Sequence, residues 1–187
     1  MSEGYNLAQG AGAGTGVEQT RYRALSRTLH WTIAGLVLLT WPLGFMISFV
    51  KQEFALNFYM LHEGFGFLVL WLMLVRIGNT LVAGHPKTTA PAIERIAAAI
   101  VHGLLYVFLI AMPVSGFLAT NAHGFPLKWF GLVPVWSPIG KTPDIAWTLS
   151  AIHTWCAWTL LVLFGLHFAA VLFHHVLRKD DTLYRML

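Results

Sequence analysis

Residues 145–177 read IAWTLSAIHTWCAWTLLVLFGLHFAAVLFHHVL, a run of 33 residues that contains no Asp, Glu, Lys or Arg. A helix needs about 20 mostly apolar residues to cross a membrane, because each residue adds about 1.5 Å to a path of about 30 Å. The run is therefore long enough to span a bilayer as a helix and to tilt within it or protrude from it.

Three earlier stretches have the same character, and Arg76 closes the second of them. The predicted helices cover about residues 25–50, 56–77, 93–120 and 143–177. Backbone groups in lipid must be paired within the protein, and no segment shows the apolar–polar alternation of barrel strands. We therefore predict an all-α fold, an integral-membrane four-helix bundle that residues 21–187 form as one domain.

The composition excludes an ordinary soluble domain. Of the 187 residues, 57% are apolar and 11% are charged, whereas a soluble domain carries about 25% charged residues. Residues 1–20 are rich in Gly, Ala, Ser and Thr and are predicted to form a disordered tail. Nucleic-acid binding is disfavoured because the 12 Lys and Arg residues form no dense basic stripe.

The positive charges predict the orientation, since cytoplasmic segments carry an excess of Lys and Arg. With the N-terminus inside, only Lys51, Lys128 and Lys141 lie outside. The nine inner charges are Arg21, Arg23, Arg27, Arg76, Lys87, Arg95, Arg178, Lys179 and Arg185. We expect both termini in the cytoplasm.

The connection 121–144 is long and rich in Gly, Pro and Trp. We interpret it as a loop that folds over the outer end of the bundle, either as a cap or as a substrate-access element. Thr142 followed by Pro143 is typical of a helix start, with the threonine as cap and the proline at the first helical position.

Histidines inside the spans indicate function, because polar groups are costly in lipid. Those at spanning depth are His30, His62, His102, His153, His167, His174 and His175. His153 and His167 are 14 residues apart, which puts their rings on one helix face, about 21 Å apart along the axis. Helix direction then predicts the partners: His30 lies at the inner level with His167, and His62 lies at the outer level with His153.

Two opposed neutral imidazoles suit axial ligation of the iron in a b-type haem. Zinc would need four ligands, commonly including thiolates or carboxylates, and the spans offer only Cys156 and Glu63. We therefore predict two haem b groups whose iron atoms bind His30, His62, His153 and His167. His174 is the competing inner ligand, because it lies seven residues beyond His167 on the same predicted face.

Several other residues are candidates for the surroundings of these groups. His102 would line a quinone pocket, stabilise a haem propionate or simply pack in the core. The glycines that could let a flat ring approach the helices are Gly35, Gly64, Gly66 and Gly165. The cations that could neutralise propionates are Arg21, Arg23, Arg27 and Arg178 inside, and Lys51 and Lys141 outside.

Several short motifs recur in order along the helices. They include Leu29-His30-Trp31, Leu61-His62-Glu63-Gly64, Ala111-Met112-Pro113-Val114-Ser115-Gly116, His153-Thr154 and Gly165-Leu166-His167. In these motifs the chain resembles the bacterial cytochrome b561 family, over almost everything after residue 20. The resemblance implies a four-helix protein of the bacterial inner membrane with two b-type haems that passes electrons between a membrane quinone and another redox partner. It implies haem ligation by the same four histidines and raises superoxide as a donor at the outer face.

Two other functions remain open. The same helices would serve in a haem-bearing cytochrome b subunit that anchors a larger oxidoreductase, or, less favourably, in a histidine-lined transporter. A quinone-linked electron carrier is the preferred interpretation. Its expected partners are membrane lipid, ubiquinone or ubiquinol and a redox partner, and the sequence is compatible with a homodimer.

Overall fold

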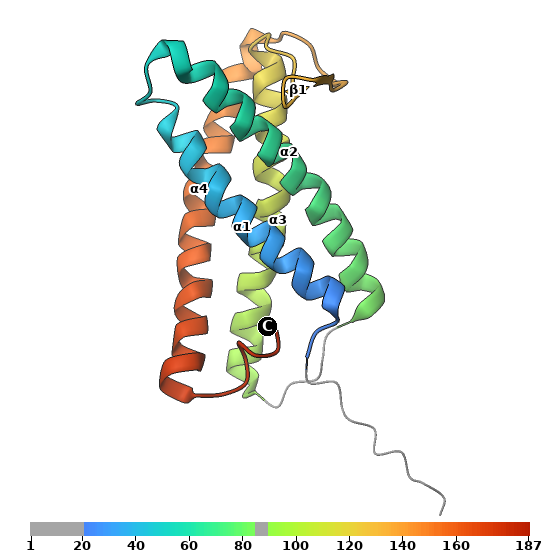
Figure 1. The fold of residues 1–187 in the computed structure, drawn as a ribbon, viewed down its shortest axis with the longest axis vertical. Coiled ribbons are helices and arrows are strands. Elements are labelled where there is room, and N and C mark those ends of the chain that lie inside the picture. Colours follow the sequence, from blue (N-terminus) through green and yellow to red (C-terminus); the bar gives the residue numbers. More distant parts are fainter. Residues whose placement is uncertain (1–20, 85–89) are drawn as a thin grey trace, which may run out of the picture.

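The computed structural model describes residues 21–84 and 90–187, and long helices make up most of this part of the chain. They are α1 (Ala24–Met46), α2 (Gln52–Ala83), α3 (Ala92–Ala122) and α4 (Pro143–Leu172). The four run in alternating directions along one bundle (Figure 1). The predicted all-α four-helix fold is confirmed, whereas the tail predicted for residues 1–20 lies outside the described residues.

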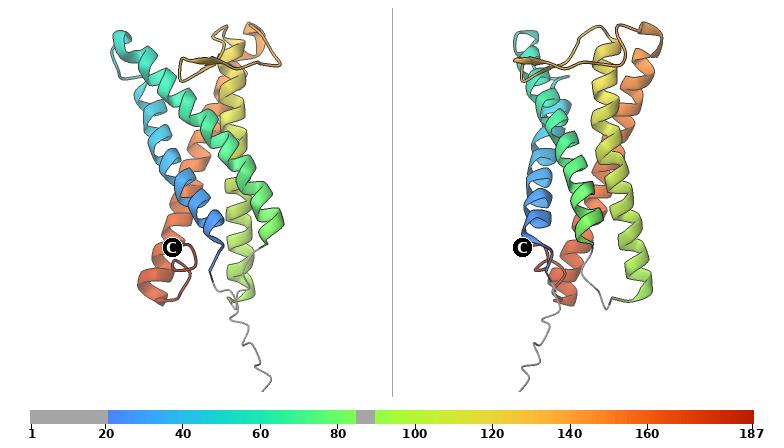
Figure 2. Two further views of the ribbon diagram at one scale, coloured as in Figure 1. Left: turned by 45° about the vertical axis from the view of Figure 1, so that its right-hand side comes forward. Right: turned by 90° about the vertical axis from the view of Figure 1, so that its right-hand side faces the viewer.

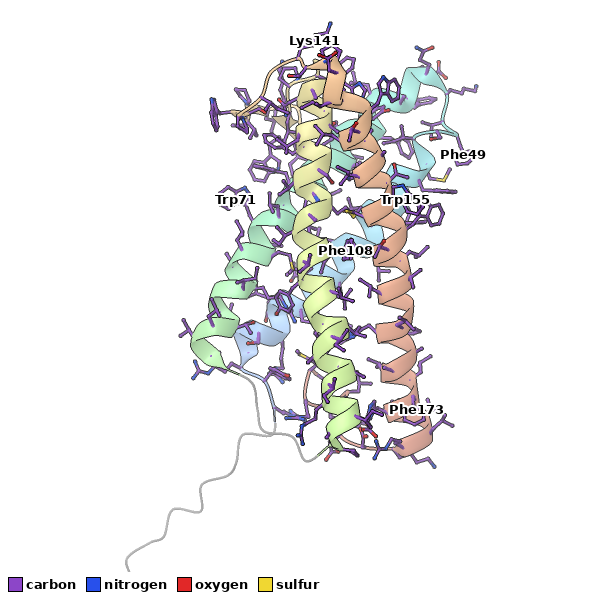
Figure 3. All side chains as sticks on the ribbon, turned by 180° about the vertical axis from the view of Figure 1, so that it is seen from behind. Phe49, Trp71, Phe108, Lys141, Trp155 and Phe173 are labelled. Carbon is purple, nitrogen blue, oxygen red and sulfur yellow. The ribbon has the colours of Figure 1, made fainter. Side chains whose placement is uncertain are left out.

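Each of the four helices is long and apolar enough to cross a membrane. Packing is closest within two pairs, α1 with α2 and α3 with α4, and Figure 2 shows these pairs side by side. Large apolar side chains cover the outside of the bundle, among them Trp155 and Phe173 (Figure 3). Such an exterior suits lipid, because a soluble protein of this size rarely exposes apolar patches so extensive.

A small apolar core joins the first two helices. It contains Leu29 and Ile33 of α1 with Val69 and Met73 of α2, and Tyr106 of α3 packs against it. Met73 is only 1% exposed. Burial of these side chains holds α1 against α2 and keeps water from the middle of the bundle.

The helix ends differ in part from the sequence prediction. The second helix was expected to close at Arg76 and instead continues to Ala83. The reason is that Arg76 is a good helix former, and its Nε donates a hydrogen bond to the Tyr106 hydroxyl at 3.0 Å. The first helix ends at Met46, before the expected residue 50.

The fourth helix begins as predicted, with Thr142 before it and Pro143 in its first turn. The Thr142 hydroxyl does not cap the helix but donates to the carbonyl oxygen of Gly140 at 2.9 Å. After Leu172 the helix widens into a π-helical segment, η1 (Phe173–Arg178). The widening ends the regular α-helical register just where the last two histidines of the span occur.

The two ends of the described chain meet at one end of the bundle (Figure 1). The Tyr22 amide donates to the carbonyl oxygen of Arg185 at 3.0 Å, and Trp31 Nε1 donates to that of Met186 at 2.8 Å. An even number of spans returns the chain to the side on which it began. That this side is cytoplasmic remains a prediction from the positive charges.

The connection between α3 and α4 crosses the opposite end of the bundle (Figure 2). It contains a short antiparallel pair of strands, β1 (Lys128–Trp129) and β2 (Val133–Pro134). Trp129 Nε1 donates to the carbonyl oxygen of Gly64 at 3.1 Å, and the Phe130 ring lies against Gly64 so closely that an added Cβ would come within 2.6 Å of it. The loop therefore packs on α2 as a cap.

Candidate functional site

His62 of α2 and His153 of α4 form a pair near the loop end, with ring centres 6.0 Å apart and ring planes at 88°. Nδ1 of His62 lies 2.9 Å from the carbonyl oxygen of Thr40, and Nδ1 of His153 lies 2.8 Å from that of Met112. A carbonyl oxygen can only accept, so each Nδ1 must carry the proton and donate it. Each Nε2 then has a free lone pair, the state in which an imidazole binds a metal.

Two glycines make room for these rings. A Cβ atom at Gly44 of α1 would lie 2.4 Å from Cε1 of His62, and one at Gly116 of α3 would lie 2.8 Å from Cε1 of His153. Real side chains do not approach this closely, so any other residue would displace the imidazole. Neither Gly44 nor Gly116 was predicted from the sequence to make room for a ring.

The four glycines that were predicted to let a flat ring approach the helices have other surroundings. A Cβ added at Gly35 or Gly165 would meet nothing within 4 Å, and one added at Gly66 would lie 4.0 Å from a methyl carbon of Thr40. Gly64 packs against Phe130. Of the four, Gly66 alone lines the cavity between His62 and His153.

That cavity is bounded by all four helices. Its walls are mainly apolar, with Val37, Val69, Leu109, Met112 and Leu160 among the lining residues. Both imidazoles of the outer pair open into it. A mostly apolar wall with a few convergent polar groups is the usual character of a cofactor site.

At the inner level His30 of α1 faces His167 of α4, with ring centres 6.2 Å apart and ring planes at 68°. His102 of α3 lies against the same partner, with its ring centre 5.3 Å from that of His167. The inner level therefore gathers three imidazoles, and the pairing of His30 with His167 is the one expected from helix direction.

His174 has a different partner. Its Nδ1 lies 2.6 Å from Oδ2 of Asp180, in the segment that follows η1. Partial burial alone would raise the pKa of Asp180, but hydrogen bonds from Thr182 and His174 outweigh it and lower the pKa to about 2. His174 thus takes part in an interaction that fastens the C-terminal segment, while His167 faces His30.

One spacing relates the two levels on every helix. Position pairs 14 residues apart are His30 and Gly44, His62 and Arg76, His102 and Gly116, and His153 and His167. Fourteen residues rise about 21 Å along a helix. The outer level thus combines two imidazoles with two glycines, and the inner level combines three imidazoles with one arginine.

Arg76 is the cation of the inner level. Its Nε donates to the Tyr106 hydroxyl, which also lies 3.2 Å from the Thr80 hydroxyl. In the described part of the chain, Nη1 of Arg76 is buried without a hydrogen-bond partner. Two arginines that were expected to neutralise propionates are engaged elsewhere, Arg27 with the Leu187 carbonyl oxygen and Arg178 with Glu94.

Both ring pairs fit a metal held between two imidazoles. A ligating nitrogen lies about 2 Å from its metal and the ring centre about 1 Å further, so two opposed imidazoles have ring centres about 6 Å apart. Over residues 21–84 and 90–187, no cluster of three or more His, Cys, Asp or Glu side chains is arranged to hold a bare metal ion. Two-sided ligation of a flat haem suits this donor set better than a closed zinc site.

A sequence profile of prokaryotic cytochrome b561 matches residues 21–187. The chain belongs to the prokaryotic cytochrome b561 family. This cytochrome b561 chain is therefore a multi-pass membrane haem protein of electron transport, and its family and four spans agree with the bacterial inner membrane. The family resemblance stated from the motifs is confirmed.

Three curated relatives cover most of this cytochrome b561 chain. Cytochrome b561 homolog 2 of Escherichia coli is 31% identical over 89% of this chain and 91% of its own length. Probable superoxide oxidase CybB of Yersinia pestis is 30% identical over 89% of this chain and 96% of its own. Cytochrome b562 of Cereibacter sphaeroides is 32% identical over 91% of this chain and 97% of its own.

Proposed function

We propose that this chain transfers electrons across the membrane through two b-type haems, with His62 and His153 as ligands of the outer one and His30 and His167 as ligands of the inner one. The observation that carries the proposal is the pair of ring separations, 6.0 Å and 6.2 Å, at two levels of one bundle. Bound in this way, haem supplies an iron that gains and loses one electron at a time.

The residues of the chain orient the ligands and keep the sites dry. The carbonyl oxygens of Thr40 and Met112 fix the tautomer and direction of the outer imidazoles. Val69 and Met73 fill the core on α2 between the levels of His62 and Arg76. When little water reaches such a site, each nearby charge has a larger effect on the reduction potential of the bound haem.

We further propose that the electrons pass between the membrane quinone pool and a small redox partner. One relative carries the name probable superoxide oxidase, and this makes superoxide the first donor to test here. Lys51, Lys128 and Lys141 are exposed. Lys51 directly precedes α2, Lys128 is in β1 and Lys141 precedes α4, so all three belong to the connections at the loop end of the bundle. Their charge would raise the local concentration of an anion near the outer pair.

Rapid-mixing spectroscopy of the purified, haem-replete protein tests this function. We expect superoxide to reduce the haem iron, so that the alpha band appears, and ubiquinone to oxidise it, so that the band disappears. The double variant Lys128→Gln with Lys141→Gln should slow reduction by superoxide and weaken its salt dependence, while leaving reoxidation by ubiquinone unchanged. Haem that superoxide does not reduce and ubiquinone does not oxidise would contradict the proposed function.

A further inference from the structure

Arg76 is placed to act on the inner haem site. It lies 14 residues after His62 on α2, at the level of His30 and His167. A cation at this depth is costly unless an anion or hydrogen-bond acceptors compensate it. Arg76 therefore calls for a partner at the same level.

The partners that the chain supplies are incomplete. Tyr106 accepts from Nε at 3.0 Å, and the ring of the same tyrosine lies 5.7 Å from the guanidinium carbon. Nη1 remains buried with no partner among residues 21–84 and 90–187. Glu63 lies at the opposite end of the bundle and accepts from Thr120. Glu94 pairs with Arg178 through Oε1, and its Oε2, like Nη1 of Arg76, is buried without a partner among these residues.

The unpartnered Nη1 of Arg76 is suited to bind a carboxylate. A guanidinium presents its N–H groups in a rigid plane that matches the two oxygens of a carboxylate. The Tyr106 hydroxyl, which also contacts that of Thr80, accepts from Nε, whereas the buried Nη1 has no acceptor among the residues described and is left for such a ligand. A b-type haem carries two propionate carboxylates, so the haem of this level brings the missing acceptor with it.

We propose that Arg76 binds a propionate carboxylate of the haem held by His30 and His167, which makes it a positioning residue of the inner site. This assignment rests on the proposed two-haem function. It replaces Arg27 and Arg178 as the inner propionate partners with an arginine whose buried nitrogen lacks an acceptor. It also predicts that the two haems differ in potential, because the matching positions of the outer level, Gly44, His62, Gly116 and His153, include no cation.

Spectroscopic redox titration of the purified haem protein tests the proposal with Arg76→Gln. Loss of the cation leaves the propionate charge uncompensated and favours ferric iron, so the potential of one haem should fall while that of the other stays. The affected haem should be the one that His30→Ala removes. Arg95→Gln is the matched control, since Arg95 lies at the same end of the bundle and donates to a backbone carbonyl oxygen, that of Ala90.

Infrared spectroscopy separates carboxylate binding from a general effect of charge. In reduced-minus-oxidised spectra of protein carrying haem labelled with carbon-13 at the propionate carboxyls, Arg76→Gln should shift one labelled band and Arg95→Gln none. Arg76→Lys, which keeps the charge but not the fork, should restore most of the potential and leave the band shifted. If Arg76→Gln protein does not accumulate, the propionate band of Arg76→Lys, compared with that of Arg95→Gln, still tests whether Arg76 binds the carboxylate.

Different results would contradict the role of Arg76 and the proposed two-haem function. Two haems in the wild type, with potentials and propionate bands that Arg76→Gln and Arg76→Lys leave unchanged, would overturn the role of Arg76 and leave the proposed function standing. A wild-type protein that binds fewer than two haems would overturn the proposed function itself, and the role of Arg76 with it.

Discussion

Nδ1 of His153 on α4 lies 2.8 Å from the carbonyl oxygen of Met112 on α3. One helix thus orients the proposed ligand that its neighbour carries, and Gly116, one turn further along α3, leaves the space in which the ring sits. The orientation of the outer pair therefore depends on the packing of α3 against α4, and not on the histidine alone.

Gly116→Ala should disturb the outer haem. The added methyl would lie 2.8 Å from Cε1 of His153, so the ring must move away from its position opposite His62. We expect loss of the outer haem or a clear shift of its spectrum, with the inner haem retained.

Gly103→Ala is the matched control on the same helix, because a Cβ there meets nothing within 4 Å. Alanine favours a helix over glycine by about 1 kcal/mol, so this variant should be at least as stable as the wild type and carry both haems. Equal haem spectra in the two variants would show that Gly116 has no part in seating the ring.

His174→Ala should leave both haems in place, whereas His167→Ala should remove the inner one. His174 contacts Asp180, and His167 faces His30 at 6.2 Å. Haem content per polypeptide, measured on the purified variants, checks this. Loss of a haem in His174→Ala, with both haems retained in His167→Ala, would show that His174 and not His167 is the inner ligand.

Acid should loosen the C-terminal segment through Asp180. Its carboxyl has a pKa of about 2 in the folded protein against a usual 3.8, so the unfolded chain binds the proton more readily. The stabilisation is complete above about pH 4 and is lost as the pH falls towards 2. Thermal unfolding of wild type and Asp180→Asn should differ above this range and converge below it, and a constant difference down to pH 2 would contradict the assignment.

The loop cap should depend on Trp129. Its indole donates to the carbonyl oxygen of Gly64, and replacing it by phenylalanine removes a hydrogen bond worth about 1 kcal/mol. We expect faster proteolysis of residues 123–142 in Trp129→Phe. Trp136→Phe is the control, since Trp136 is 82% exposed, and equal cleavage rates in the two variants would argue against a capping role for Trp129.

Much of the bundle was predictable because the apolar runs and the 14-residue spacing of His153 and His167 follow from helix geometry alone. The prediction that the second helix ends at Arg76 was wrong, because a charged residue can lie at the edge of the lipid while the backbone hydrogen bonds of the helix continue past it. Gly44 and Gly116 gave no local signal, because glycine is common wherever membrane helices pack closely. Their distance of 14 residues from His30 and His102 would have revealed them.

The environment of His174 was not predictable from helical periodicity. The seven-residue spacing from His167 assumes a continuous α-helix, and η1 replaces that geometry with a wider turn. The contact with Asp180 then depends on how the chain folds back after Lys179, which has a left-handed backbone conformation. Such a return is a property of the tertiary structure and not of the local sequence.

The central claim is most directly tested by spectroscopic redox titration, with haem quantified per polypeptide, of His30→Ala, His62→Ala, His153→Ala and His167→Ala beside the wild type. The account predicts two haems in the wild type and one in each variant, with the same component lost in His30→Ala and His167→Ala and the other lost in His62→Ala and His153→Ala. Loss of one common component in His30→Ala and His62→Ala, or retention of both haems in any of the four variants, would contradict it.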